Sequence, residues 1–108
     1  MSNTKAIAIT SENQLDNILQ QHSKAVIFFA ARWCEPCKQM KPVFDGLAQK
    51  YLNIAFALVN FGNNSNTTQK YSIGALPTAK LVNKGKVVDQ AIGPDKNQLE
   101  DAVDSLAF

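Results

Sequence analysis

Two stretches of the chain are apolar without alternation. Residues 25–30 read AVIFFA, and residues 54–60 read IAFALVN. A half-buried strand alternates apolar and polar residues, whereas a continuous apolar run is typical of a strand covered by helices on both faces. Both stretches are therefore predicted to be buried strands of a sheet with parallel pairing.

Apolar residues at spacings of three and four predict the helices. The first begins at a capping box, with Ser11 as N-cap and Gln14 reaching back, and ends at about residue 21. The second extends over residues 40–51 and contains Pro42, where a kink is expected. A short helix is expected at residues 67–71, and a last one follows Asp95 as N-cap, with its apolar face formed by Leu99, Val103 and Leu106.

The remaining segments complete the order of elements. Residues 6–10 predict a short edge strand, and residues 78–82 and 87–92 predict a hairpin whose turn contains Gly85. The predicted order is β-α-β-α-β-α-β-β-α, in which strands separated by helices are expected to be parallel and the final hairpin antiparallel. The predicted fold class is α/β, with a central mixed β-sheet flanked by helices on both faces.

Composition favours one globular domain over residues 1–108. Hydrophobic residues make up 45% of the chain and charged residues 19%, as in ordinary folded proteins. The net charge of +2 is small and scattered, so nucleic acid is not expected as a partner. No apolar run approaches the roughly 20 residues of a membrane span, and the N-terminus lacks a signal-peptide core. We expect a cytoplasmic monomer that does not bind membranes.

The chain has two cysteines, Cys34 and Cys37. A bond between them would close a loop too short to restrain the unfolded chain strongly, so a structural role explains the pair poorly. Cys34 lies where a buried strand gives way to a helix, and the unpaired N–H groups there stabilise a thiolate. Cys34 is therefore predicted to attack a substrate disulfide, and Cys37, one helical turn later, to resolve the mixed disulfide.

Two other interpretations of this pair stay open. In the first, both cysteines are unreactive thiols of the core. A zinc or iron–sulfur site normally takes four ligands, whereas the chain offers this pair and one distant histidine, His22. Metal would require a dimer that shares two pairs, so no metal or other cofactor is expected.

Three segments together resemble the thioredoxin family: residues 33–38 (WCEPCK), 71–78 (YSIGALPT) and 83–85 (NKG). The resemblance extends over nearly the whole chain and implies a thioredoxin-like fold and a protein-disulfide reductase. It implies that Cys34 is the nucleophile, that Cys37 is the resolving thiol and that Pro77 is a cis-proline opposite them. The implied partners are disulfide-containing proteins and a thioredoxin reductase that draws on NADPH, since this chain has no glycine-rich dinucleotide loop.

The same resemblance implies a shallow apolar docking surface around the reactive sulfur. Its members would be Trp33, Leu76, Pro77, Ile92 and Gly93. The backbone of Leu76 would pair with an extended segment of the substrate, and an exposed patch of this kind suits weak, transient recognition.

The residues between the cysteines depart from the Gly-Pro that is usual in the family. Glu35 and Pro36 are expected to tune the redox couple. A carboxylate about 6 Å from the thiolate, at an effective dielectric of about 40, disfavours that thiolate by roughly 1.4 kcal/mol, or about one pKa unit. We therefore predict that Glu35 raises the pKa of Cys34 and makes the couple more reducing than glycine would.

A second departure concerns the core. Many thioredoxins bury an acidic residue where this chain has Phe28, and often pair it with a lysine where this chain has Leu58. Losing both charges together avoids an unpaired buried ion. Because the family's acid helps to remove the proton of the resolving thiol, we expect slow resolution of mixed disulfides. The alternative hypothesis is therefore a thioredoxin-like binding or accessory module whose redox chemistry is vestigial.

Overall fold

The computed structural model describes residues 6–108. Along the chain lie β1 (Ile7–Ile9), α1 (Glu12–Gln21), β2 (Lys24–Ala30), α2 (Glu35–Lys50), β3 (Ala55–Asn60), the 3-10 helix η1 (Phe61–Asn63), α3 (Ser65–Lys70), β4 (Thr78–Asn83), β5 (Lys86–Ile92) and α4 (Lys96–Ala107). This is the predicted order of elements, with η1 added in the loop after the third strand.

The strands form one mixed sheet in the order β1-β3-β2-β4-β5. β3 is parallel to β1 and β2, as predicted for strands that are connected through helices. β4 also follows a helix but is antiparallel to β2, so the prediction of parallel strands is wrong at this connection. The six residues of α3 rise only about 9 Å, whereas β3 spans about 20 Å, so α3 does not return the chain to the edge where β3 began.

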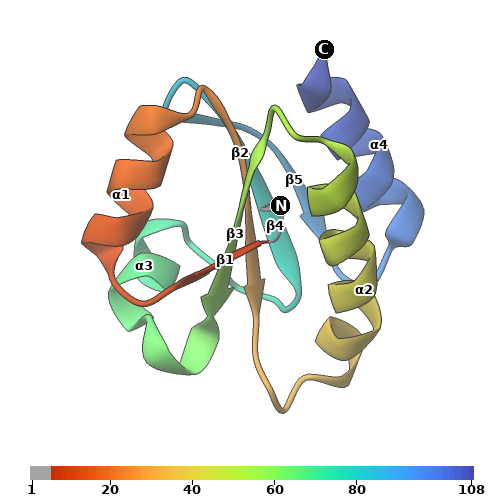
Figure 1. The fold of residues 1–108 in the computed structure, drawn as a ribbon. Coiled ribbons are helices and arrows are strands. Elements are labelled where there is room, and N and C mark those ends of the chain that lie inside the picture. The colour runs from red at the N-terminus through yellow and green to blue at the C-terminus, as the bar shows by residue number, and fades with distance from the viewer. Residues whose placement is uncertain (1–5) are drawn as a thin grey trace.

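Helices cover both faces of the sheet, as predicted: α1 and α3 lie on one side and α2 and α4 on the other (Figure 1). Side chains of β2 alternate between the two faces. Val26 and Phe28 belong to the core under α2 and α4, whereas Ile27 and Phe29 belong to the core under α1. Both faces of β2 are therefore buried, which accounts for the unbroken apolar run in its sequence.

Local polar groups set the ends of the helices. The Ser11 hydroxyl accepts a hydrogen bond from the Gln14 amide at 3.1 Å, and the Asp95 carboxylate accepts one from the Gln98 amide at 3.0 Å. Both residues are N-caps, as predicted. In a capping box the Gln14 side chain would accept a hydrogen bond from the amide of the N-cap, Ser11. Here its oxygen accepts one from the amide of the preceding residue, Thr10, at 2.7 Å.

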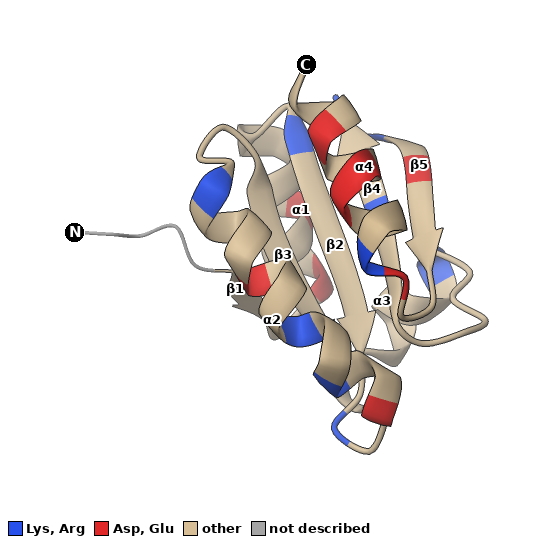
Figure 2. Cartoon of the chain, turned by 90° about the vertical axis from the view of Figure 1, so that its right-hand side faces the viewer, with Lys and Arg blue, Asp and Glu red and all other residues tan. Residues whose placement is uncertain are grey.

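Charged side chains of both signs are spread over the helices and strands (Figure 2). At the start of α2, residues of opposite sign lie close together, and their pairing bears on the chemistry of the nearby cysteines. Within residues 6–108, no helix is long and apolar enough to cross a membrane.

Candidate active site

Cys34 lies at the junction between β2 and α2. It is the N-cap of α2, with an extended backbone (φ −92°, ψ 109°). Its sulfur accepts a hydrogen bond from the Cys37 amide at 3.3 Å, and its carbonyl accepts one from the Lys38 amide at 3.3 Å. Pro36, in the first turn, has no N–H to leave unpaired. The helix therefore directs its free N–H groups and its positive end at the Cys34 sulfur.

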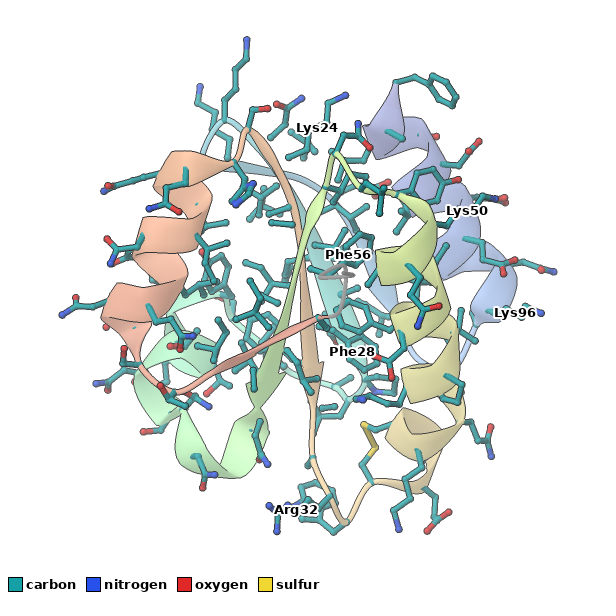
Figure 3. The ribbon with its side chains drawn as sticks, in the orientation of Figure 1. Lys24, Phe28, Arg32, Lys50, Phe56 and Lys96 are labelled. Atoms are coloured by element: carbon teal, nitrogen blue, oxygen red, sulfur yellow. A yellow bond between two sulfur atoms is a disulfide. The ribbon has the colours of Figure 1, made fainter. Side chains whose placement is uncertain are left out.

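Cys34 and Cys37 form a disulfide, with their Cα atoms 5.3 Å apart. The bond is visible in yellow at the foot of α2 (Figure 3). Both residues are buried, Cys34 being 6% exposed and Cys37 3% exposed. His22 is the C-cap of α1 and precedes β2, so it lies at the far end of this strand from the two sulfurs.

The loop before β4 brings a second group of predicted residues to the disulfide. The Leu76–Pro77 peptide bond is cis, as expected for Pro77. Leu76 packs against the small apolar cluster that Cys34 and Cys37 form with a neighbouring alanine. The Pro77 carbonyl accepts a hydrogen bond from the Gly93 amide at 2.8 Å. Leu76 therefore contacts the cysteine cluster, and its neighbour Pro77 is linked to Gly93 by this hydrogen bond.

The other two residues of the predicted docking surface are exposed hydrophobics. Trp33 is 71% exposed and directly precedes Cys34, and Ile92 is 47% exposed at the end of β5. Ile92 pairs in register with Thr78, the residue after Pro77, and its amide donates to the Gln98 side chain at 3.1 Å. Gly93 adopts φ 87°, a left-handed conformation in which a side chain would be strained.

Glu35 is paired, a feature that the sequence analysis missed. Its carboxylate lies 3.1 Å from the Lys38 ammonium, one helical turn later. Both side chains are mostly in solvent. The signal was the (i, i+3) spacing of opposite charges in a helix, which favours such pairs. The field that Glu35 exerts on Cys34 is therefore partly cancelled by Lys38.

Phe28 and Leu58 lie side by side at matching positions of β2 and β3. Phe28 is 1% exposed, and its ring stacks on Phe44 of α2 with centroids 4.7 Å apart. Phe56 meets Phe44 edge-on at 5.4 Å, and Figure 3 shows Phe28 and Phe56 between the sheet and α2. Two apolar side chains therefore fill the positions at which many family members carry a charged pair, and they belong to the packed core.

A cleft of about 420 Å³ lies beside Cys37 and was also missed. Its wall includes Leu58, and its rim includes Lys41, whose ammonium lies 2.9 Å from the Asp45 carboxylate. The spacing of Lys41 and Asp45, four residues apart in a helix, could have indicated the ion pair. The cleft itself could not be predicted, because it needs the relative placement of β1, β3 and α2.

Perturbed acidities lie away from the cysteines. The hydrogen bond that Tyr51 donates to Asp104 at 2.7 Å raises the pKa of this tyrosine. Burial raises the pKa of Tyr71. The carboxylate of Asp16, 3.3 Å away, raises the pKa of Lys70. Lys70 joins α3 to α1 and Tyr51 joins the end of α2 to α4, and none of the three groups adjoins the disulfide in sequence.

A family model described as Thioredoxin matches residues 5–105. The chain belongs to the thioredoxin family. Thioredoxin 2 of Chlorobaculum tepidum is 36% identical over 102 residues, which cover 93% of this chain and 94% of that protein. Thioredoxin 1 of Plasmodium falciparum is 29% identical over 99 residues, which cover 92% of this chain and 95% of that protein. The chain also matches, at 35% identity, 31% of the length of the TPR repeat-containing thioredoxin TDX of Oryza sativa subsp. japonica.

Solved structures agree with this assignment. The thioredoxin of Malassezia sympodialis (Mala s 13) superposes with a TM-score of 0.93 at 26% identity, covering 100% of this chain and 96% of that chain. The predicted thioredoxin-like α/β fold is confirmed. With its bonded cysteine pair, this thioredoxin-family chain is a dithiol–disulfide oxidoreductase.

Proposed function

We propose that the chain reduces disulfides in other proteins, with Cys34 as the nucleophile and Cys37 as the resolving thiol. The observation that carries this assignment is the position of Cys34 at the N-cap of α2, where the Cys37 amide donates to its sulfur. A thiolate gains from both the N–H group and the helix dipole, so Cys34 is the better nucleophile of the two.

The proposed reaction proceeds through two exchanges. The Cys34 thiolate attacks one sulfur of the substrate disulfide, and the other substrate sulfur leaves with the electron pair and is protonated. Cys37 then loses its proton and attacks the Cys34 sulfur, which releases the second substrate thiolate. Two electrons and two protons pass from the dithiol to the substrate, and the chain is left with the Cys34–Cys37 disulfide that the structure contains.

We assign substrate docking to Trp33, Leu76, Pro77, Ile92 and Gly93. Support comes from Leu76, which packs against the cluster that contains both cysteines, and from the exposed apolar side chains of Trp33, next to Cys34, and Ile92, next to Gly93. Disulfide-containing proteins are the proposed substrates, and a thioredoxin reductase is the proposed source of electrons. We propose the cytoplasm as the compartment, because a chain that works as a dithiol needs reducing surroundings.

Two cysteine variants test the roles. The reduced Cys37→Ser variant should attack an insulin disulfide, displace one insulin sulfur as a thiol and remain bound to the other in a stable mixed disulfide, whereas Cys34→Ser should form none and lose insulin reduction. Retained insulin reduction in Cys34→Ser would overturn the assignment. If both variants kept the binding of a partner protein while the unaltered chain turned over no disulfide, the accessory-module alternative would replace it.

The docking surface is tested with matched variants. Trp33→Ala and Ile92→Ser should lower kcat/KM for insulin and leave the reduction of a small aromatic disulfide unchanged, because only a protein substrate reaches the rim. Leu52→Ser is the control, since Leu52 is also 71% exposed but follows the opposite end of α2. An equal loss in Leu52→Ser would refute a specific docking surface.

A further inference from the structure

The cleft adjoins Cys37 and not Cys34. Cys37 is among the residues that line it, and Cys34 is not. Its wall is apolar, and its rim is polar or cationic; the described lining residues are Ala8, Ile9, Thr10, Ala30, Ala31, Arg32, Cys37, Lys38, Lys41, Leu58, Asn60 and Asn63. The cleft therefore adjoins the resolving cysteine on the side of β1 and β3.

The charged residues among those described as lining the cleft are all cationic. Arg32, Lys38 and Lys41 contribute three cationic groups to the lining, and none of the described lining residues is acidic. Lys38 is held by Glu35 at 3.1 Å. Lys41 follows Cys37 by four residues in α2, so the two share one side of the helix. A positive rim favours a thiolate over a thiol, because only the thiolate carries charge.

We propose that this cleft is the route by which the Cys37 proton leaves, and that Lys41 is a positioning residue that stabilises the Cys37 thiolate. The inference rests on the proposed role of Cys37 as the resolving thiol. In the mixed disulfide, Cys37 gives its proton to water in the cleft, and its thiolate attacks the Cys34 sulfur. The bond between Cys34 and the substrate breaks, and the substrate sulfur leaves with the electron pair and takes a proton from solvent.

The route replaces one that the core no longer offers. Phe28 and Leu58 are apolar, so neither position offers a carboxylate that could accept the proton. Leu58 also lines the cleft, so the same replacement leaves its inner wall without an ionisable group. The proton is then accepted by water at the rim, and the rate depends on how well the rim stabilises the charge left on sulfur.

Asp45 provides the opposing influence. Its carboxylate accepts from the Lys41 ammonium at 2.9 Å, and both side chains are partly exposed. Removing the Lys41 charge should make ionisation of Cys37 harder, whereas removing the Asp45 charge should make it easier. A merely structural role of the ion pair would instead make the two variants alike, because each substitution breaks the same pair.

The test uses the reduced full chain and a chromogenic aromatic disulfide in rapid mixing. Attack by Cys34 releases the first chromogenic thiolate, and resolution by Cys37 releases the second, so the second phase reports Cys37. Lys41→Met should slow the second phase about threefold at neutral pH and move its pH midpoint upward, for a charge about 8 Å from sulfur at an effective dielectric of about 60. Asp45→Asn should speed it by a smaller factor, because Asp45 lies eight residues from Cys37 along α2, and should move the midpoint downward.

Controls keep the inference separate from the proposed function. Lys50→Met, at the exposed C-terminal end of α2, should leave both phases unchanged. In a Cys34→Ser background, the ultraviolet absorbance of the remaining thiolate gives the same order of midpoints without any reagent. If Lys41→Met and Asp45→Asn shifted the midpoint in the same direction, or neither shifted it, the role of Lys41 would be overturned. The two kinetic phases would still be present, so the proposed roles of the cysteines would stand. Absence of the second phase in the unaltered chain would overturn the role of Cys37 itself.

Discussion

The charges of Glu35 and Lys38 act on Cys34 in opposite directions, and removing them one at a time gives a quantitative prediction. The carboxylate and the ammonium are 3.1 Å apart in the first turn of α2, with side chains 76% and 58% exposed. Glu35 alone would disfavour the Cys34 thiolate, and Lys38 alone would favour it. The combined effect of these two side chains on the Cys34 thiolate is therefore the difference between two opposing contributions.

The size of each term follows from Coulomb's law. A single charge about 6 Å from the sulfur contributes roughly 1.4 kcal/mol at an effective dielectric of about 40, and one at about 7 Å contributes roughly 1.2 kcal/mol. The difference is roughly 0.2 kcal/mol, which corresponds to a pKa change of less than about 0.2. The rise of about one pKa unit expected from Glu35 alone therefore shrinks when Lys38 is included, and solvent screening reduces both terms further.

Single and double substitutions separate these terms. Glu35→Gln should lower the pKa of Cys34 by about half a unit, and Lys38→Met should raise it by a similar amount. The double variant should return to within about 0.2 units of the unaltered chain. Glutamine is preferred to glycine because it keeps the helical backbone of the first turn unchanged.

The assay is the pH dependence of Cys34 alkylation by iodoacetamide in the reduced protein, at low and at high salt. Glu100→Gln is the matched control, since it removes a carboxylate from α4 rather than from α2. The reasoning fails if both single variants raise the pKa of Cys34, because that would indicate a disturbed helix start instead of a changed field. It fails equally if Glu35→Gln leaves the midpoint unchanged at low salt.

Three further predictions concern the core, the helix packing and a cap. Phe28→Asp should lower the free energy of unfolding by about 3–5 kcal/mol in urea titrations, because it removes a buried ring. Adding Leu58→Lys should recover part of this loss, since it gives the buried carboxylate a partner. The double variant should also resolve mixed disulfides faster than the unaltered chain. Asp104→Asn should lower the raised pKa of Tyr51 toward 10.0 in an ultraviolet titration. In the unaltered chain the raised pKa of Tyr51 adds stability below pH 10.0, and this stability is lost as the pH rises through the pKa of Tyr51 in the folded state. Ser11→Ala should cost about 1 kcal/mol by urea unfolding, because the Gln14 amide loses its acceptor.

Patterns within single elements predicted most of the fold. The apolar run at residues 25–30 lies within β2, both of whose faces are covered, and Asp95 caps α4 as expected. The junction of a buried strand and a helix was sufficient to place Cys34 at a helix N-terminus. These features depend on periodicity and capping, which act over a few residues and can be read directly from the sequence.

Features that depend on the relative placement of distant segments were not predictable in this way. The orientation of β4 depends on how far α3 carries the chain, which the position of α3 in the sequence does not specify. The contact between the Gly93 amide and the Pro77 carbonyl joins residues from two ends of the hairpin, and their place near the cysteines came from the family resemblance. The cleft beside Cys37 needs β1, β3 and α2 together, and no spacing along the chain indicates it.

The redox potential of the cysteine pair and the rate of its second step depend on different residues. If the resolving thiol is largely protonated at neutral pH, its thiolate is a small fraction of the dithiol form. Stabilising that thiolate then hardly changes the free energy of the dithiol, and so hardly changes the redox potential. Its attack, by contrast, is proportional to that fraction. Changes at Lys41 should therefore alter the rate of resolution at a nearly constant potential, whereas changes at Glu35 and Lys38 should alter both through Cys34. A core with Phe28 and Leu58 in place of a buried charged pair is compatible with a working oxidoreductase for this reason: the proton of Cys37 leaves through the cleft, and the helix start that stabilises Cys34 stays in place.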